Sequence, residues 1–272
     1  MPVTADYHLH SAFSGDSNAP MEQMILRAID LGLTEMCFTE HMDLDYPVTD
    51  STPPGFFEVD LDACLSDLLR YRDAYADKIK IRFGIELGMQ PHLAADNARI
   101  AGAFDFDFII ASTHIAQHMD PYLPSYFEGR SDEEGYRAYF EETLSCMETF
   151  SDFDVYGHID YVIRYGKSRD AGYSYEKYGD LFDRMIRLLL EKGKGIECNT
   201  GGLRKGLREV HPCLSFLRRY REMGGEIVTV GSDAHTPADI AADFDRAAQS
   251  LQACGFSRYA TFEKRRPIFH PL

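Results

Sequence analysis

Histidines and carboxylates recur at one kind of position in this sequence, at or just after the end of a short apolar run. His8 and His10 close the first such run, and Asp233 and His235 follow a run that ends at Val230. The other residues placed in this way are His41, Glu86, His114, His158 and Glu197. Imidazole combined with carboxylate is typical of sites for zinc, iron or manganese, whereas calcium and magnesium prefer oxygen ligands alone. The residue types therefore predict a transition-metal site.

The spacing inside two of these groups supports the same prediction. Residues i and i+2 of a strand point to the same face, so His8 and His10 can hold one ion together. A single His-x-His is a weak signal, but Asp233 and His235 repeat the spacing at the other end of the chain. Closure of a barrel would bring these two pairs side by side.

The elements that must position these residues alternate between strand-like and helix-like patterns. The apolar runs are Asp6–Leu9, Met36–Thr39, Ile79–Leu87, Phe106–Ser112, Val155–Ile159, Gly195–Cys198, Ile227–Val230 and Tyr259–Phe262. Between them, Pro20–Leu31, Asp180–Leu190 and Cys213–Tyr220 carry apolar residues at helical spacing. Asn18 lies close enough to cap the first of these helices. Such alternation predicts parallel βα units.

Seven or eight βα units in a chain of this length predict a closed or nearly closed α/β barrel. An open doubly wound sheet would give similar local patterns, but the sequence has no glycine-rich dinucleotide or P-loop fingerprint to favour it. In a parallel barrel the carboxyl ends of the strands share one rim, where barrel enzymes assemble their sites. Pro47–Gly55 and Met119–Asp132 have little periodicity and are predicted to be loops over that rim.

Length, charge and cysteine usage limit the function classes. The 272 residues, 44% of them apolar, predict one domain spanning residues 1–272. A formal charge of −16 repels phosphate backbones, so we expect no nucleic acid partner. No run approaches the ~20 apolar residues of a membrane span. The six cysteines form no CxxC pair and the N-terminus lacks a signal peptide, which predicts a reduced, cytoplasmic protein.

Taken in order, the motifs resemble those of the polymerase and histidinol phosphatase (PHP) superfamily, within it the histidinol-phosphate phosphatase branch. They are Asp-Tyr-His-Leu-His-Ser at 6–11, Phe-Thr-Glu-His at 38–41, Gly-Ile-Glu at 84–86, Ser-Thr-His at 112–114, Gly-His-Ile-Asp at 157–160, Glu-Cys-Asn-Thr-Gly-Gly-Leu-Arg-Lys-Gly at 197–206 and Gly-Ser-Asp-Ala-His at 231–235. The resemblance implies a distorted, TIM-like (β/α)7 barrel with three divalent metal ions, zinc, iron or manganese, at the carboxyl rim of its strands. It also implies a phosphoric monoester hydrolase of histidine biosynthesis, which releases L-histidinol and phosphate from L-histidinol phosphate by metal-activated hydroxide attack.

Carried over by matching motif, the resemblance implies a ligand set for each ion. The first ion would be held by His8, His10, Glu86 and Asp233. The second would share Glu86 as a bridge and add His114 and His158. The third would be held by Asp16, His41 and His235. Many relatives carry a histidine where this chain has Asp16, and either residue type can ligate a metal.

Phosphate recognition requires a cationic site. Three divalent ions, three carboxylate ligands and one hydroxide leave a charge of about +2, which suits a phosphate dianion. Arg164 and Arg204 follow strand ends, and the planar guanidinium can donate two hydrogen bonds to phosphate, so both are candidate clamps. The leaving alcohol needs a proton donor, for which we favour Asp233 over His235.

The cationic end of the substrate needs an acceptor. Glu197 is the first candidate to contact an amine, although it could equally support the structure around it. His118 lies in a loop that could overhang the mouth of the barrel. The loops Asp43–Phe57 and His118–Tyr126 would supply the walls of a substrate pocket.

Three alternatives stay open. A PHP-type phosphatase could act on a phosphotyrosine protein or a nucleotide. A barrel amidohydrolase is disfavoured because Glu86 stands at the third strand and Lys167, Lys192 and Lys194 do not clearly end strands. A non-catalytic module of the kind attached to bacterial DNA polymerases is disfavoured by the intact ligand set.

Overall fold

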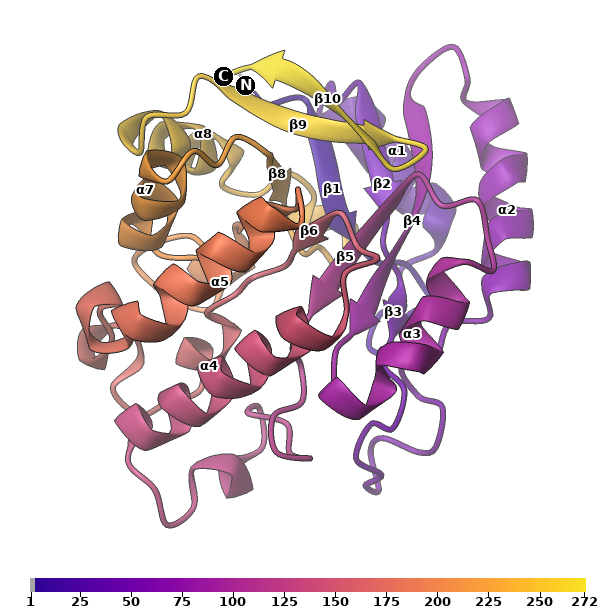
Figure 1. The fold of residues 1–272 in the computed structure, drawn as a ribbon. Helices are drawn as coiled ribbons and strands as arrows, with labels where there is room; N and C mark the ends of the chain where they lie inside the picture. The colour runs from indigo at the N-terminus through magenta and orange to yellow at the C-terminus, as the bar shows by residue number, and fades with distance from the viewer. Residues whose placement is uncertain (1–2) are drawn as a thin grey trace.

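Seven parallel strands form the wall of a barrel in a computed structural model of the chain, which describes residues 3–272 (Figure 1). The strands pair in the order β1 (Ala5–Leu9), β2 (Glu35–Phe38), β4 (Lys80–Gly88), β5 (Phe108–Ser112), β6 (Val155–Tyr156), β7 (Gly195–Asn199) and β8 (Val228–Gly231). Beyond these strands, His10 N donates to Ala234 O and Asp233 N donates to His8 O, each at 2.8 Å, which joins the two ends of the sheet. The predicted distorted (β/α)7 barrel is confirmed, and the open doubly wound sheet is excluded.

Helices cover the outer face of the barrel (Figure 1). They are α1 (Met21–Asp30), α2 (Leu61–Ala74), α3 (Ala94–Ala101), α4 (Asp132–Thr149), α5 (Gly179–Glu191), α7 (Leu214–Glu222) and α8 (Phe244–Ala253), with a short α6 (Gly201–Arg204) after β7. Single 3-10 turns lie at η1 (Pro91–Leu93), η2 (Pro124–Phe127), η3 (Tyr161–Arg164), η4 (Arg169–Gly172), η5 (Tyr175–Tyr178) and η6 (Pro237–Asp239). The three predicted helices are confirmed as α1, α5 and α7. The predicted cap is wrong, because Pro20 occupies the N-cap position and no side chain caps α1.

The last apolar run does not form another parallel βα unit. It forms β9 (Arg258–Glu263), which pairs antiparallel with β10 (Arg266–Pro271) in a sheet of its own. Lys264 and Arg265 connect them with φ values of 49° and 64°, and a two-residue turn with both values positive matches the twist of a hairpin. The hairpin crosses the amino ends of the barrel strands, near both chain termini (Figure 1).

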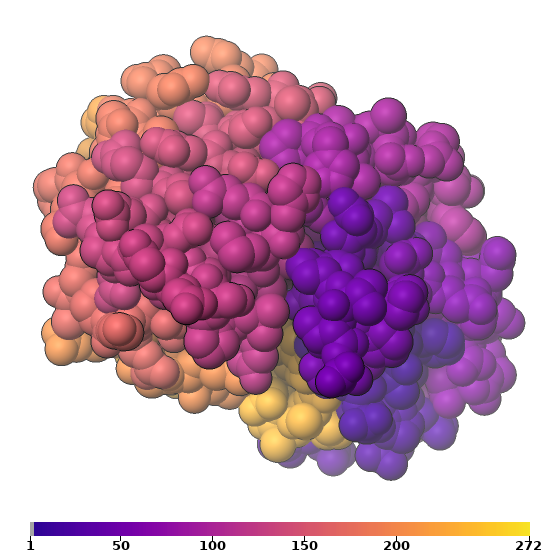
Figure 2. All heavy atoms as spheres, turned by 90° about the horizontal axis from the view of Figure 1, so that it is seen from below, coloured from indigo at the N-terminus to yellow at the C-terminus, as the bar shows by residue number. Residues whose placement is uncertain are grey.

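The opposite end of the barrel carries the two predicted loops. Seen from that side in Figure 2, the violet segment around residue 50 lies beside the magenta segment around residue 120. The hydroxyl of Tyr46 donates to Asp120, which ties the two segments together. A short strand that the sequence did not predict, β3 (His41–Met42), pairs parallel with β4 at this end.

Between residues 3 and 272, no helix has the length and apolar character needed to cross a membrane. All six cysteines are buried and unpaired.

Candidate metal centre and active-site cavity

The carboxyl rim of the barrel gathers all nine residues that we expect to bind metal. Strand β1 delivers His8 and, directly after its end, His10, while β3 and β4 deliver His41 and Glu86. The segments that leave β5, β6 and β8 deliver His114, His158, Asp233 and His235, and the loop after β1 delivers Asp16. Six of the nine residues are buried, Asp233 and His235 are half-buried and Asp16 is exposed, although they come from positions more than 200 residues apart. Parallel strands explain this convergence, because every strand ends at the same rim.

Glu86 lies at the centre of the cluster. Its Oε2 is 3.2 Å from His8 Nε2, 3.5 Å from His10 Nε2 and 3.1 Å from His41 Nδ1. Its Oε1 is 3.3 Å from His114 Nε2 and 3.0 Å from His158 Nε2. The backbone register of β3 and β4 sets His41 directly beside Glu86. Burial alone would raise the pKa of Glu86, but the surrounding imidazoles, first those of His8 and His114, hold that pKa well below its usual value.

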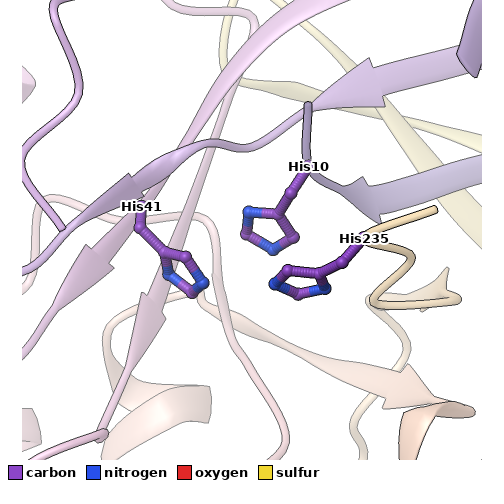
Figure 3. A group of neighbouring side chains, drawn as sticks. All are labelled: His10, His41 and His235. Atoms are coloured by element: carbon purple, nitrogen blue, oxygen red, sulfur yellow. The ribbon is translucent and has the colours of Figure 1, made fainter. Parts of the chain in front are cut away.

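Several polar atoms of this cluster are buried without a hydrogen-bond partner. Among the described residues they are His8 Nε2, His10 Nε2, His41 Nδ1, Glu86 Oε2, His158 Nδ1 and His235 Nε2. Buried polar atoms normally have partners, so a concentration of unpaired ones indicates a ligand. Figure 3 shows the rings of His10, His41 and His235 gathered around a common space. Nitrogen and carboxylate donors arranged in this way fit divalent transition metals.

The potential ligand atoms form four groups, and within each group the atoms lie within 4.8 Å of one another. These groups are His8, His10 and Asp233; His8, Glu86 and His158; His41, Glu86 and His114; and His10, His41 and His235. Asp16 adds a further oxygen next to the last group, since its Oδ2 lies 3.2 Å from His235 Nε2 and its Oδ1 lies 3.7 Å from His41 Nε2. Each of these groups has the donors to hold a divalent cation.

Hydrogen bonds behind the cluster orient three of the imidazoles. The Nδ1 atoms of His8, His10 and His114 lie 2.6, 3.0 and 2.7 Å from Glu197 Oε1, Ser14 Oγ and Asp43 Oδ1. Each contact turns Nε2 of the ring toward the centre, as is usual for metal-bound histidine.

The position of Glu197 corrects the expectation that it contacts substrate. Its side chain is fully buried, and Oε2 accepts hydrogen bonds from His158 N at 2.9 Å and Asn199 Nδ2 at 3.1 Å. Gly231 packs so closely that a Cβ there would lie 2.3 Å from Glu197 Oε1. With both oxygens occupied and no route to the cavity, Glu197 positions His8 and the start of the His158 loop.

A cavity of about 550 Å³ opens beside the cluster. Its lining includes Asp16, His41, His114, His158, Asp233 and His235 from the cluster. The two predicted arginine clamps also line it. Arg204 Nη2 donates to the backbone oxygens of Ser232 and Asp233 at 2.6 and 3.0 Å, while its Nη1 is buried without a partner among the described residues. This amino group is a buried donor without an acceptor, in a side chain that lines the cavity.

Arg164 is held more firmly than Arg204. It is 7% exposed, and its Nη2 donates to Asn199 Oδ1 and Asp233 Oδ2, both at 3.3 Å. Burial alone would raise the pKa of Asp233, but His8 and then Arg164 hold that pKa well below its usual value. Gly201 allows the close approach here, because a Cβ would lie 3.0 Å from Asp233 Oδ2 and 3.1 Å from Arg164 Nη2.

The remaining walls agree only partly with the sequence. Both predicted loops contribute, through Asp43, Tyr46, Thr52 and Phe57 from one and Asp120 and Tyr122 from the other. His118 does not line the cavity, which corrects its expected role. Its side chain is exposed on the outside of the loop, with its ring 5.5 Å from that of His92.

Further lining residues were not singled out from the sequence. They are Tyr161, Tyr165, Lys205 and Asp239. A signal for the tyrosines exists, since they flank Arg164 within one 3-10 turn and the next residue. Asp120 lies within the predicted loop His118–Tyr126, but its hydrogen bond with the distant Tyr46 was not predicted.

Comparison with known proteins identifies the family. The model of the PHP domain matches residues 6–201. The chain belongs to the PHP domain family. Among curated relatives, a Clostridium acetobutylicum protein named "Probable histidinol-phosphatase" is 32% identical over 264 residues, covering 96% of this chain and 97% of its own length. A Lactococcus lactis protein named "Histidinol-phosphatase" is 30% identical over 258 residues, covering 94% of this chain and 93% of its own length.

Solved structures of PHP proteins share the fold. The histidinol phosphate phosphatase of Lactococcus lactis, solved with zinc, L-histidinol and phosphate, superposes with a TM-score of 0.87 and 28% identity over 97% of this chain and 98% of that chain. A putative histidinol phosphatase from Listeria monocytogenes superposes with a TM-score of 0.77 at 20% identity, over 89% of this chain and 99% of that chain. The second likeness concerns the fold alone.

Proposed function

We propose that this PHP protein is a metal-dependent phosphomonoesterase that hydrolyses L-histidinol phosphate to L-histidinol and inorganic phosphate. One observation carries the proposal: two arginines and a cluster of buried, partnerless imidazole and carboxylate atoms face one cavity. The likeness over nearly the whole chain to an enzyme solved with zinc, L-histidinol and phosphate supports this substrate.

We propose three divalent ions for the cluster, with zinc, iron and manganese all compatible with its donors. His8, His10, Glu86 and Asp233 would hold the first ion. Glu86, His114 and His158 would hold the second. Asp16, His41 and His235 would hold the third. When bound, such ions activate water near neutral pH and neutralise charge on the phosphoryl oxygens.

The chain's own cations would bind and orient the phosphate. Arg204 lines the cavity with a guanidinium whose Nη1 has no acceptor among the described residues, which supports a role in phosphate binding, and the contacts of Arg164 with Asn199 and Asp233 support a fixed orientation beside the metal ligands. Guanidinium groups suit this task because they donate in a plane with fixed geometry.

Asp233 and His235 are the candidates to give the leaving alcohol its proton. Both line the cavity, and Asp233 Oδ1 lies 3.7 Å from His235 Nδ1. Asp233 remains our preferred group, but its lowered pKa keeps it ionised, so it would relay a proton to the alcohol rather than hold one, and substrates with different leaving groups can test this role. An alcohol needs protonation as it leaves, whereas nitrophenolate does not. Loss of the donor should therefore slow the hydrolysis of histidinol phosphate more than the hydrolysis of p-nitrophenyl phosphate, when both are measured at equal metal content.

Because Glu197 does not line the cavity, the cationic end of histidinol phosphate would bind elsewhere, at the wall that Asp120 forms. Asp120 supports this placement, because its carboxylate is buried among Tyr46, Tyr122 and the cavity. Tyr161 and Tyr165 offer aromatic faces next to it, which favour an ammonium or imidazolium group.

A comparison of phosphate monoesters tests the assignment. We expect kcat/KM for histidinol phosphate to exceed that for p-nitrophenyl phosphate, a phosphotyrosine peptide or a nucleotide by several decades, because a paired polar site discriminates strongly. Asp120→Asn should reduce this difference, because it should lower kcat/KM for histidinol phosphate and leave kcat/KM for the other substrates unchanged. Similar kcat/KM values for all four substrates would overturn the histidinol assignment and leave a general PHP phosphoesterase.

A further inference from the structure

A buried histidine outside the metal cluster has both ring nitrogens engaged. His211 is fully buried, its Nε2 lies 2.9 Å from Arg164 Nε, and its Nδ1 lies 2.5 Å from Asp160 Oδ1. Neither its sequence context nor the metal set assigns it a role. The contact with Arg164 connects it to the cavity.

The partners determine where the proton of His211 lies. The Nε–H of a guanidinium can only donate, so His211 Nε2 must accept and the ring proton must lie on Nδ1. That proton is donated to Asp160, which is itself fully buried. The order Asp160, His211, Arg164 therefore has one direction of hydrogen bonding.

The far end of this row is fixed as well. Asp160 Oδ2 accepts from the backbone N of Cys213 at 2.9 Å and from the hydroxyl of Tyr173 at 3.1 Å. The near end is packed tightly, since a Cβ on Gly202 would lie 2.4 Å from His211 Nε2. Backbone and packing together leave His211 little freedom to turn.

We propose that Asp160 and His211 are positioning residues that set the orientation of Arg164 for phosphate binding. His211 fixes the Nε edge of the guanidinium, while Asn199 and Asp233 accept from Nη2. No hydrogen bond among residues 3–272 uses the Nη1 amino group, and the Arg164 side chain lines the cavity, so Nη1 remains available to an anion there. The inference rests on the proposed function, because it assigns Arg164 to the phosphate.

Asp160→Asn is the most informative variant. The backbone N–H of Cys213 must donate, so the amide oxygen of the asparagine takes that side and its NH2 faces His211 Nδ1. His211 then carries its proton on Nε2. That N–H faces the Nε–H of Arg164, so two donors meet and the hydrogen bond between the two residues is lost. The variant keeps the size of the side chain and reverses the direction of the hydrogen bond, as in other wrong-tautomer substitutions.

His211→Asn breaks the same row in a different way. Its amide nitrogen takes the place of Nδ1 and keeps the bond to Asp160, while nothing replaces the acceptor for Arg164. Tyr173→Phe is the matched control, because it removes a hydrogen bond from the same carboxylate without touching its contact with His211.

The experiment measures inhibition by inorganic phosphate, KM and kcat for histidinol phosphate, and metal content, all on the metal-loaded enzyme. In Asp160→Asn and His211→Asn we expect the inhibition constant for phosphate and the KM each to rise about tenfold, with kcat changed less and metal content unchanged. Tyr173→Phe should keep both values near those of the wild type.

Four results would overturn the inference. Three concern the variants above: wild-type phosphate inhibition in Asp160→Asn, loss of metal from Asp160→Asn, or an equal loss of phosphate binding in Tyr173→Phe. The fourth is wild-type phosphate inhibition in Arg164→Ala, which would show that Arg164 does not bind the phosphate. Failure of the wild type to hydrolyse histidinol phosphate, with phosphate still binding through Arg164, would instead overturn the proposed function and leave this inference standing.

Discussion

The two ends of the barrel both bury charged groups, but only at the carboxyl end do some atoms of these groups lack a hydrogen-bond partner among residues 3–272. At the amino end, Tyr7 donates to Glu35 at 2.5 Å and to Phe262 O at 2.8 Å. Arg82 joins the same group, with Nε 2.8 Å from Glu35 and Nη2 3.0 Å from Glu263. These side chains find their partners within the chain, and they attach the β9–β10 hairpin to the barrel.

At the carboxyl end, the imidazoles and Glu86 instead leave ring nitrogens and a carboxylate oxygen without hydrogen bonds. Burying polar groups without partners costs stability, so a fold keeps them where a ligand completes the bonding. The difference separates charges that hold the fold together from charges that hold a ligand. Substitutions at the two ends should therefore affect different measurements.

The largest effect is expected at the centre of the metal cluster. Glu86→Ala removes the carboxylate that contacts five imidazoles, so we expect loss of bound metal and a fall in activity of roughly 10⁴-fold or more, since the ligands act as a unit. Chelation of the wild type should abolish activity in the same way and lower the Tm, because metal binds the folded state. Metal analysis and turnover measure both effects. Retention of metal and turnover by Glu86→Ala and His10→Ala would falsify the site assignment.

A smaller effect on metal binding is expected at Glu197, which contacts the metal ligand His8 but is not itself a proposed ligand. Glu197→Gln weakens the acceptor for His8 Nδ1, so metal affinity should fall by about 10- to 100-fold. Activity on every phosphate monoester should fall together and recover with added metal. A selective loss of histidinol phosphate hydrolysis at full metal content would instead show that Glu197 contacts the substrate.

The phosphate clamp should respond without loss of metal. Arg204→Ala removes the unpaired Nη1 donor, and kcat/KM should fall by about one to two decades, the scale of a hydrogen bond to a charged group. Arg164→Ala should act in the same direction. Titration of bound metal checks that the cluster remains filled. Wild-type kinetics in both variants would show that neither arginine contacts the phosphate.

The smallest effect on catalysis is expected at the amino end. Tyr7→Phe removes the donor to Glu35 and Phe262 O, so the free energy of unfolding should fall by about 1–3 kcal/mol. Metal content and kcat/KM should stay at wild-type values. Denaturant unfolding of the metal-free and metal-loaded protein measures the change. A loss of metal in this variant would contradict the separation of the two ends.

Much of the architecture could be predicted from local patterns. The strands β1, β2, β4, β5, β7 and β8 fall within two residues of the predicted apolar runs, because buried parallel strands are continuous in hydrophobicity. The hairpin was missed for a local reason as well. Lys264 and Arg265 are not the glycine or asparagine that usually indicate a two-residue turn, yet both adopt positive φ.

Side-chain roles were harder to predict than strand positions. Glu197 and His118 both have residue types suited to substrate binding, but burial directs one to His8 and a turn of the loop directs the other away from the cavity. His211 looked unremarkable because its partners lie 47 and 51 residues away in the chain. Asp120 lies in a loop that was predicted as a pocket wall, but its own role was not singled out, since its partner Tyr46 is 74 residues distant.

The sequence by itself determined which residue types stand at which strand ends, and from these followed the barrel, the family and the convergence of nine potential ligands. A parallel barrel brings all its strand ends to one rim, so the order of the motifs was enough. Only the tertiary structure decided which of the rim residues face the cavity and which support them from behind. That choice depends on packing and on hydrogen bonds between distant segments, such as Glu197 with His8 and Asp160 with His211, and no local pattern encodes these contacts.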